Sequence, residues 1–216
     1  MPFSDNNLRL FPKQGKPSGF DPLFYESMAR KNGYQLIAGV DEVGRGPLAG
    51  PVVAAAVILP EDLILSGIQD SKKMTPKGRE KAFEVINEHA LAIGIGVVSH
   101  RFIDKTNILT ASLEAMKQAV SFLEPAPQYV LVDGIHKLPD LIPQKCIKKG
   151  DQLSLSISAA SVIAKVYRDN IMCSLNERFP EFGFCQHKGY GTARHLEALK
   201  HYGPCPVHRR SFKGVC

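Results

Sequence analysis

The sequence predicts an α/β domain built on a mixed sheet, followed by a mostly helical C-terminal part. Three observations predict it. Two strong apolar runs, 35–43 and 51–59, are separated by a glycine-rich turn and have the pattern of a β-hairpin. A third apolar run, 91–99, follows a helical segment. From about residue 101 the apolar positions take a helical spacing, interrupted by one more strand that ends at Asp133.

The first helix is expected over about 22–32. Asp21 is placed as an N-cap, Gly33 as a stop, and Phe20 can pack against Tyr25. Residues 1–19 are polar and contain three prolines and two glycines, so we expect a flexible arm there.

Capping residues and spacing place the later elements. Thr75 caps a helix that begins at Pro76, and apolar residues recur at spacings of 7, 4, 3, 4 and 3 over about 101–123. A buried strand, 129–132, follows. Two more helices are expected, over about 155–177 and over 192–202, the second closed by Gly203.

Composition limits the class of protein. With 216 residues and 44% hydrophobic content, the chain can bury a sizeable core. A net charge of +6 suits a polyanionic partner. Five widely spaced cysteines, an odd number, indicate reduced thiols and a cytosolic protein. No apolar run reaches the roughly 18 residues of a membrane span, so we expect a soluble, cytoplasmic protein.

Asp41 and Glu42 end an apolar strand and open onto the glycine-rich turn. An ideal strand points successive side chains to opposite faces, so both can serve one metal site only where the strand is ending or bulged. If strand 129–132 lies parallel beside strand 35–43, Asp133 comes next to Asp41. Asp151 stands in a loop just before the long helix. Carboxylates gathered in this way repel one another unless cations neutralise them, and all-oxygen ligands favour Mg²⁺ or Mn²⁺ over zinc.

The turn at Gly44, Arg45 and Gly46 allows two interpretations. A dinucleotide-binding loop would need a helix after it, but the run 51–59 is β-branched. Closely spaced glycines instead let backbone groups approach a ligand such as a sugar hydroxyl.

Basic residues are interleaved with small and aromatic ones in three segments, 70–73, 187–192 and 208–212, each of which alone is commonly a solvated loop. Tyr190 lies between two glycines that expose its ring for stacking. A zinc site is an alternative interpretation, but its candidate ligands only partly fit finger spacing: Cys185, His187, Cys205 and His208.

Several ordered blocks resemble bacterial ribonuclease HII, of the type 2 ribonuclease H family. The resemblance covers roughly residues 35–213. The blocks are GVDEVGRGPLAGP (39–51), DSK (70–72), VLVDG (130–134), KGD (149–151), SAASVIAKV (158–166) with RD (168–169), and HKGY (187–190).

The resemblance implies an RNase H-like fold, with a mixed five-stranded sheet flanked by helices and a helical C-terminal extension. We therefore expect a flexible arm at 1–19, a catalytic domain at 20–177, and an extension at 178–216 that contributes to substrate binding.

The resemblance also implies an activity and a site. The enzyme would hydrolyse the RNA strand of RNA/DNA hybrids and nick 5′ to ribonucleotides embedded in duplex DNA, with two ions of Mg²⁺ or Mn²⁺. By their positions, Asp41, Glu42, Asp133 and Asp151 match the metal-binding carboxylates. Gly44, Arg45 and Gly46 match the motif that reads the 2′-hydroxyl, Lys72 matches a phosphate contact, and Tyr190 matches the ring that stacks on the next sugar.

Further expectations concern partners and alternatives. We expect a monomer that removes ribonucleotides from DNA during repair and replication. No sliding-clamp tail is evident, and the N-terminal arm is too short for the extra domain of ribonuclease HIII. Asp169 is expected in a capping or supporting role. The alternatives are a general metal-dependent nuclease or strand transferase on the same fold, and a non-catalytic protein that binds hybrids.

Overall fold

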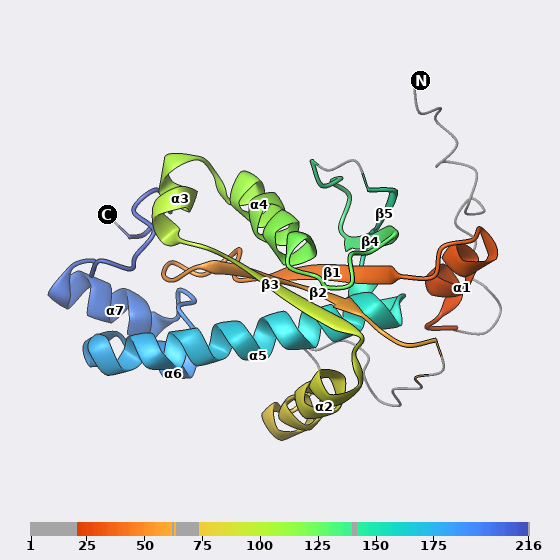
Figure 1. Cartoon of the computed structure of the whole chain (residues 1–216). Helices are drawn as coiled ribbons and strands as arrows, with labels where there is room; N and C mark the ends of the chain where they lie inside the picture. Colours follow the sequence, from red (N-terminus) through yellow and green to blue (C-terminus); the bar gives the residue numbers. More distant parts are fainter. Residues whose placement is uncertain (1–20, 62, 64–73, 140–141, 216) are drawn as a thin grey trace.

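The structure is a computed structural model that describes residues 21–61, 63, 74–139 and 142–215. Five strands form one sheet in the order β3-β2-β1-β4-β5 (Figure 1). Strand β1 pairs antiparallel with β2 and parallel with β4, so the predicted mixed five-stranded sheet is confirmed. The strands are β1 Ile37–Val43, β2 Val52–Ile58, β3 Ala92–Val98, β4 Tyr129–Asp133 and β5 Gln144–Ile147.

Helices cover both faces of the sheet. Figure 1 shows α3 and α4 on one side and α2 with the long α5 on the other, while α6 and α7 lie at one end. The helices are α1 Phe24–Lys31, α2 Pro76–His89, α3 His100–Lys105, α4 Ile108–Ser121, α5 Leu155–Arg178, α6 Phe184–His187 and α7 Ala193–Tyr202.

Strand β2 is buried on both faces, which explains its unbroken apolar run. Ala54, Ala56 and Ile58 belong to the core beneath α4, whereas Ala55 and Val57 belong to the core beneath α2 and α5. Alternate residues thus join the sheet to opposite helical layers.

The predicted helix at 101–123 is wrong as one element. It consists of α3 and α4, separated at Thr106 and Asn107. The side chain of Asn107 accepts a hydrogen bond from the Thr110 amide at 2.9 Å and so begins a new helix. The apolar spacing continues across this break, which hid it.

Other boundaries differ less. The hairpin, the Thr75 cap and the last helix are confirmed, but α1 begins at Phe24, and Asp21 accepts a hydrogen bond from the Leu23 amide instead of capping the helix. Strand β5 was not predicted from the residues themselves, because its four residues carry little apolar pattern. Phe20 and the arm at 1–19 lie outside the described residues.

The C-terminal part shares a core with the segment that follows β1. Phe182 and Phe184 pack in one cluster with Leu48 and with Met172 of α5. The segment after β1 is further bonded to this part, because the Leu48 amide donates to the Gly189 carbonyl at 2.8 Å. The C-terminal part therefore supports the glycine-rich turn that follows β1.

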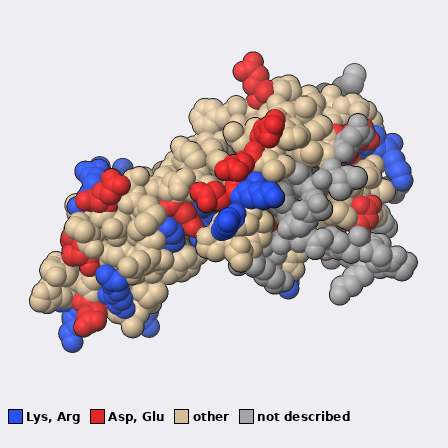
Figure 2. All heavy atoms as spheres, turned by 90° about the horizontal axis from the view of Figure 1, so that it is seen from below, with Lys and Arg blue, Asp and Glu red and all other residues tan. Residues whose placement is uncertain are grey.

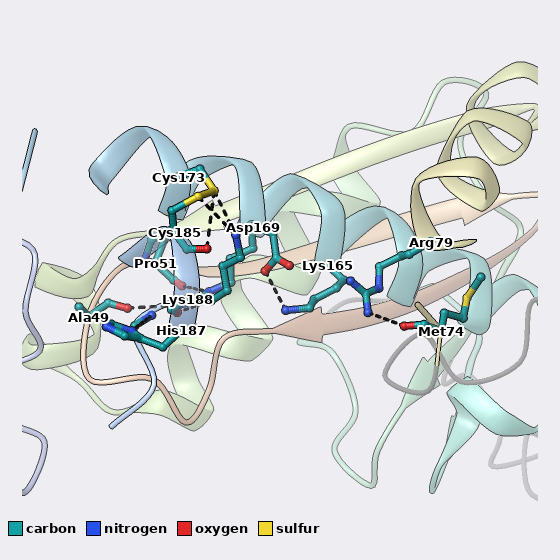
Figure 3. A network of polar contacts seen from close by, with 12 residues as sticks. Ala49, Pro51, Met74, Arg79, Lys165, Asp169, Cys173, Cys185, His187 and Lys188 are labelled. Atoms are coloured by element: carbon teal, nitrogen blue, oxygen red, sulfur yellow. Dashed lines mark hydrogen bonds and ion pairs between the residues drawn. A yellow bond between two sulfur atoms is a disulfide. The ribbon is translucent and has the colours of Figure 1, made fainter. Parts of the chain in front are cut away.

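The cysteine prediction is wrong for one pair. Cys173 of α5 and Cys185 of α6 form a disulfide, drawn in Figure 3, whereas Cys146 and Cys205 are free. The two residues are 12 apart in sequence, but the chain folds back after α5 and brings their Cα atoms to 4.2 Å. Spacing alone did not reveal this reversal.

Within the described part of the chain, no helix has the length and apolar character needed to cross a membrane. Figure 2 shows the charges on one face of the molecule, where Lys and Arg side chains gather near the middle with Asp and Glu side chains beside them. The net positive charge is therefore not a single uniform patch on this face.

Candidate active site

Three acidic residues meet where β1 and β4 end. The parallel pairing of the two strands runs through Val40 and Val132, and the next residues along each strand are Asp41 and Asp133. The carboxyl ends of parallel neighbours lie at the same sheet edge, where ligands bind in α/β folds. The conditional prediction that Asp133 comes next to Asp41 is therefore confirmed.

Strand β1 continues beyond its pairing with β4. Asp41, Glu42 and Val43 remain in regular register with β2, so no bulge separates the two acids. The two acids were expected either at a bulge or where the strand is ending, and the structure shows the second arrangement. The Glu42 amide donates to Oδ1 of Asp41 at 2.7 Å, which holds one carboxylate against the backbone.

Carboxylate oxygens of Asp41, Glu42 and Asp133 lie within 4.8 Å of one another. Asp41 is only 4% exposed, and Glu42 and Asp133 are partly buried. Three hard oxygen donors so close together fit a divalent cation such as Mg²⁺ or Mn²⁺. This acidic cluster is the candidate metal site.

Burial and mutual repulsion act on these acids. Burial raises the pKa of Asp41 well above its usual range, and the charges of Glu42 and Asp133 raise it further. Burial also raises the pKa of Glu42, although Arg45 opposes this shift. Without a cation, full ionisation of the cluster is therefore unfavourable.

Asp151 lies beside the cluster but outside the set of mutually close oxygens. It sits in a 3₁₀ turn, Gly150–Gln152, that precedes α5, and its charge contributes to the raised pKa of Asp41. Oδ1 of Asp133 accepts a hydrogen bond from the Gly150 amide at 2.6 Å. One predicted ligand thus anchors the turn that carries another.

The predicted substrate turn follows directly. Gly44 has φ +96°, a conformation that favours glycine, while Arg45 and Gly46 are exposed. The Arg45 guanidinium lies 3.1 Å from a Glu42 carboxylate oxygen, so the turn is also tied to the acidic cluster.

Tyr190 faces the same turn. Its side chain is 44% exposed, and a Cβ atom added to Gly46 would lie 3.5 Å from its ring. A ring this accessible can stack on a sugar or base. Lys72 lies outside the described residues.

Sequence reasoning missed several supporting residues. Ser161 of α5 hydrogen-bonds to the Asp41 carboxylate. Arg168 and Arg209 are fully buried behind the turn, although the segment 208–212 was expected to be solvated. For Arg168 a signal existed, since it continues the buried face of α5 one turn after Ala164. For Arg209 the basic segment offered none.

Two other predicted features resolve differently. Asp169 forms an ion pair with Lys165 at 2.7 Å, as Figure 3 shows, in keeping with a supporting role. Of the zinc candidates, Cys185 is in the disulfide, and His208 faces His195 with their Nε2 atoms 3.0 Å apart. Among the described residues, only the acidic cluster has the spacing of a metal site.

Comparisons with known proteins agree with this architecture. The sequence model of the Ribonuclease HII family matches residues 38–215. A ribonuclease HII of Geotalea daltonii is 58% identical over 193 residues, which cover 89% of each chain.

Solved structures show the same fold. The ribonuclease H2 of Pyrococcus horikoshii OT3 is 30% identical with a TM-score of 0.72, covering 83% of this chain and 94% of that one. The ribonuclease HII in a complex with PCNA from Archaeoglobus fulgidus is 28% identical with a TM-score of 0.69, covering 82% and 95%. The chain therefore belongs to the ribonuclease HII family, metal-dependent endoribonucleases that cleave the RNA of RNA/DNA hybrids.

Proposed function

We propose that this ribonuclease also nicks duplex DNA on the 5′ side of an embedded ribonucleotide, using two divalent cations at Asp41, Glu42, Asp133 and Asp151. The observation that carries the proposal is one juxtaposition. Three carboxylates with oxygens within 4.8 Å of one another lie directly before an exposed glycine turn, and Tyr190 faces that turn. Chemistry and ribose recognition would then occur at one place.

The chain's own part in catalysis is to hold oxygen ligands in place. The Glu42 amide holds Asp41, and the Gly150 amide holds Asp133. When bound, two ions of Mg²⁺ or Mn²⁺ supply an activated water and stabilise the leaving oxygen of a phosphodiester. Attack with departure of the 3′ oxygen leaves a 3′-hydroxyl and a 5′-phosphate.

Substrate choice would come from the turn and the ring. Backbone groups of Gly44, Arg45 and Gly46 would contact the 2′-hydroxyl, which distinguishes RNA from DNA at one site. Tyr190 would stack on the sugar of the following deoxynucleotide, and Lys72 would contact a phosphate.

A labelled DNA duplex with one internal ribonucleotide tests the proposal. In Mg²⁺ or Mn²⁺, but not in a chelator, we expect a single nick 5′ to the ribonucleotide with a 3′-hydroxyl end. Asp133→Asn keeps a hydrogen-bond acceptor for Gly150 but removes a charged ligand, so kcat should fall about 100-fold or more. Hybrid binding and the melting temperature should change little.

Controls separate the alternatives. Glu84→Gln, an exposed carboxylate on α2, should retain full activity. Equal cutting of an all-DNA duplex would indicate a general nuclease. Hybrid binding without any metal-dependent nick would indicate a non-catalytic binding protein.

The same reasoning extends to domains and partners. We propose that 20–177 is the catalytic domain and that 178–216 contributes to substrate binding, since Tyr190 lies in that part. We also propose a monomer that acts in the cytoplasm, where it removes ribonucleotides from DNA during repair and replication. We also propose that a sliding clamp recruits this chain, since the Archaeoglobus fulgidus relative is known in complex with PCNA.

A further inference from the structure

Two buried guanidinium groups lie behind the exposed turn. Arg168 of α5 and Arg209 of the C-terminal segment are both 0% exposed. Neither takes part in an ion pair within the described residues. A buried charge is unfavourable unless polar groups surround it. The hydrogen-bond acceptors of these two groups therefore show what the buried charges hold in place.

Arg209 binds the backbone of the segment after β1. Its Nη2 donates to the carbonyl of Gly44 at 2.5 Å, and its Nη1 donates to the carbonyl of Arg45 at 2.9 Å. Its Nε donates to the carbonyl of Gly50 at 3.0 Å, and Nη2 also reaches that of Pro51 at 3.2 Å. One side chain therefore joins both ends of the loop.

Arg168 joins the same loop to the segment that carries Tyr190. Its Nε donates to the Pro51 carbonyl at 2.9 Å, and its Nη2 donates to that of Ala49 at 3.2 Å. Its Nη1 donates to the carbonyl of Lys188 at 3.0 Å. Figure 3 shows that these three carbonyl-bearing residues, Ala49, Pro51 and Lys188, lie close together.

Peptide geometry gives the Arg209 contacts a directional consequence. In a trans peptide the C=O and N–H bonds point in opposite directions. With the carbonyls of Gly44 and Arg45 turned toward Arg209, the amides of Arg45 and Gly46 point away from the buried guanidinium. No described residue accepts a hydrogen bond from either amide.

Burial lowers the pKa of both arginines, but both remain protonated at neutral pH. Burial lowers the pKa of Arg168 to about 10 and that of Arg209 to about 9, and for Arg209 the nearby charge of Arg168 adds to the effect. Two positive charges beneath the turn also polarise its peptide dipoles. Donors fixed in this way before binding lose little freedom when a ligand arrives.

We propose that Arg209 and Arg168 are positioning residues for ribose selection. Arg209 orients the peptide groups of residues 44–46, and Arg168 holds this turn at a set position relative to Tyr190. The inference rests on the proposed function, in which that turn reads the 2′-hydroxyl. Neither arginine is assigned a contact with the substrate.

Lysine substitutions test it, because lysine keeps a charge but cannot donate to several carbonyls in a fixed fork. The readout is the ratio of affinities for two duplexes of one sequence, one with a single ribonucleotide and one all DNA, measured by fluorescence anisotropy with Ca²⁺ in place of Mg²⁺. This ratio does not depend on the folded fraction of the sample.

In Arg209→Lys we expect the ratio to fall about tenfold toward one, with little change in affinity for the all-DNA duplex. Arg168→Lys should also lower this ratio. In the Arg168→Lys background, Tyr190→Ala should lower the ratio by less than it does in the unmodified protein. Arg210→Lys, an exposed neighbour, should leave the ratio unchanged. An unchanged ratio in both folded variants of the buried arginines would overturn the inference.

A measurement on the unmodified protein avoids any failure to fold. The amide resonances of Arg45 and Gly46 should shift on adding the ribonucleotide duplex and not on adding the all-DNA duplex. Unchanged resonances would overturn the inference even if neither variant folds. Equal wild-type affinity for the two duplexes would instead refute the proposed ribose reading, which distinguishes the two failures.

Discussion

Single residues at this edge of the sheet carry buried charges of both signs in different surroundings. Asp41 lies among other carboxylates, and burial together with their repulsion raises its pKa. Arg168 and Arg209 lie among backbone carbonyls, whose dipoles favour the positive charge. The acidic cluster therefore needs a cation to ionise fully, whereas the arginines are satisfied by the chain itself.

Glu26 of α1 is a further buried ionisable residue. It is 1% exposed, and its Oε1 accepts hydrogen bonds from Ser154 Oγ at 2.6 Å and from the Ser156 amide at 2.9 Å. Burial raises the pKa of Glu26 above its ordinary value of 4.5, although these hydrogen bonds oppose the shift. The residue thus fixes the start of α5, four residues after Asp151.

This shift predicts a pH dependence of stability. A raised folded-state pKa gives a contribution that is fully present below the ordinary value and is lost as pH rises through the raised one. Relative to Glu26→Gln, the free energy of unfolding of the unmodified protein should therefore fall over the pH range that begins near the ordinary value of 4.5 and extends upward. Urea denaturation across this range measures it.

The exposed Glu84 supplies the matched control. The difference in the free energy of unfolding between Glu84→Gln and the unmodified protein should be nearly independent of pH. A difference for Glu26→Gln that stays constant, or that grows in favour of the glutamate as pH rises, would contradict the prediction.

Among the elements, α5 organises the site. Gly39 of β1 lets this helix approach closely, since a Cβ atom there would overlap the backbone of Ser156. Along its length, α5 then presents Ser161 to Asp41, Arg168 to the turn, and Cys173 to α6. One helix therefore connects the metal site with the C-terminal part.

The disulfide between α5 and α6 should stabilise this connection. Closing a loop between residues 12 apart restricts the unfolded chain, and its removal by Cys185→Ser should lower the free energy of unfolding by about 2–3 kcal/mol. In excess dithiol reductant the variant and the unmodified protein should become nearly equal. Chemical denaturation with and without reductant measures both.

Cys205→Ser is the control for this prediction. The Cys205 thiol is free, so reductant should not alter the difference in the free energy of unfolding between that variant and the unmodified protein. Alkylation of the unreduced protein should spare Cys173 and Cys185. Labelling of both residues under those conditions would show that the bond is absent.

At the scale of the whole molecule, charge acts through its distribution. The chain carries a net charge of +6, yet acidic and basic side chains lie side by side on the face in Figure 2. Affinity for a nucleic acid should therefore depend on a limited number of phosphate contacts.

Salt dependence measures those contacts. Binding of a hybrid should weaken as salt rises, and Lys72→Gln should reduce the slope of log K against log salt by about one. Tyr190→Ala should weaken binding with the slope unchanged, because stacking releases no counterions. Anisotropy titrations at several salt concentrations give the slopes, and a changed slope for Tyr190→Ala would contradict the assigned role.

Local pattern was a reliable guide where a few neighbouring residues decide an element. The unbroken apolar run of β2 and the cap at Thr75 each involve a few residues, so these elements could be predicted. The split between α3 and α4 could not, because a continuous apolar face hid the competing cap at Asn107. Strand β5 depends on β4 for its pairing more than on its own residues.

For the site, the sequence by itself determined which residue types stand at the ends of the strands and in the turn. Asp41, Glu42 and Asp133 could be named because each follows an apolar run. Only the tertiary structure decided that β4 lies parallel to β1, that Cys173 meets Cys185, and that Arg209 turns inward. These are contacts between residues far apart in the chain, and their free energy depends on packing that no local spacing encodes.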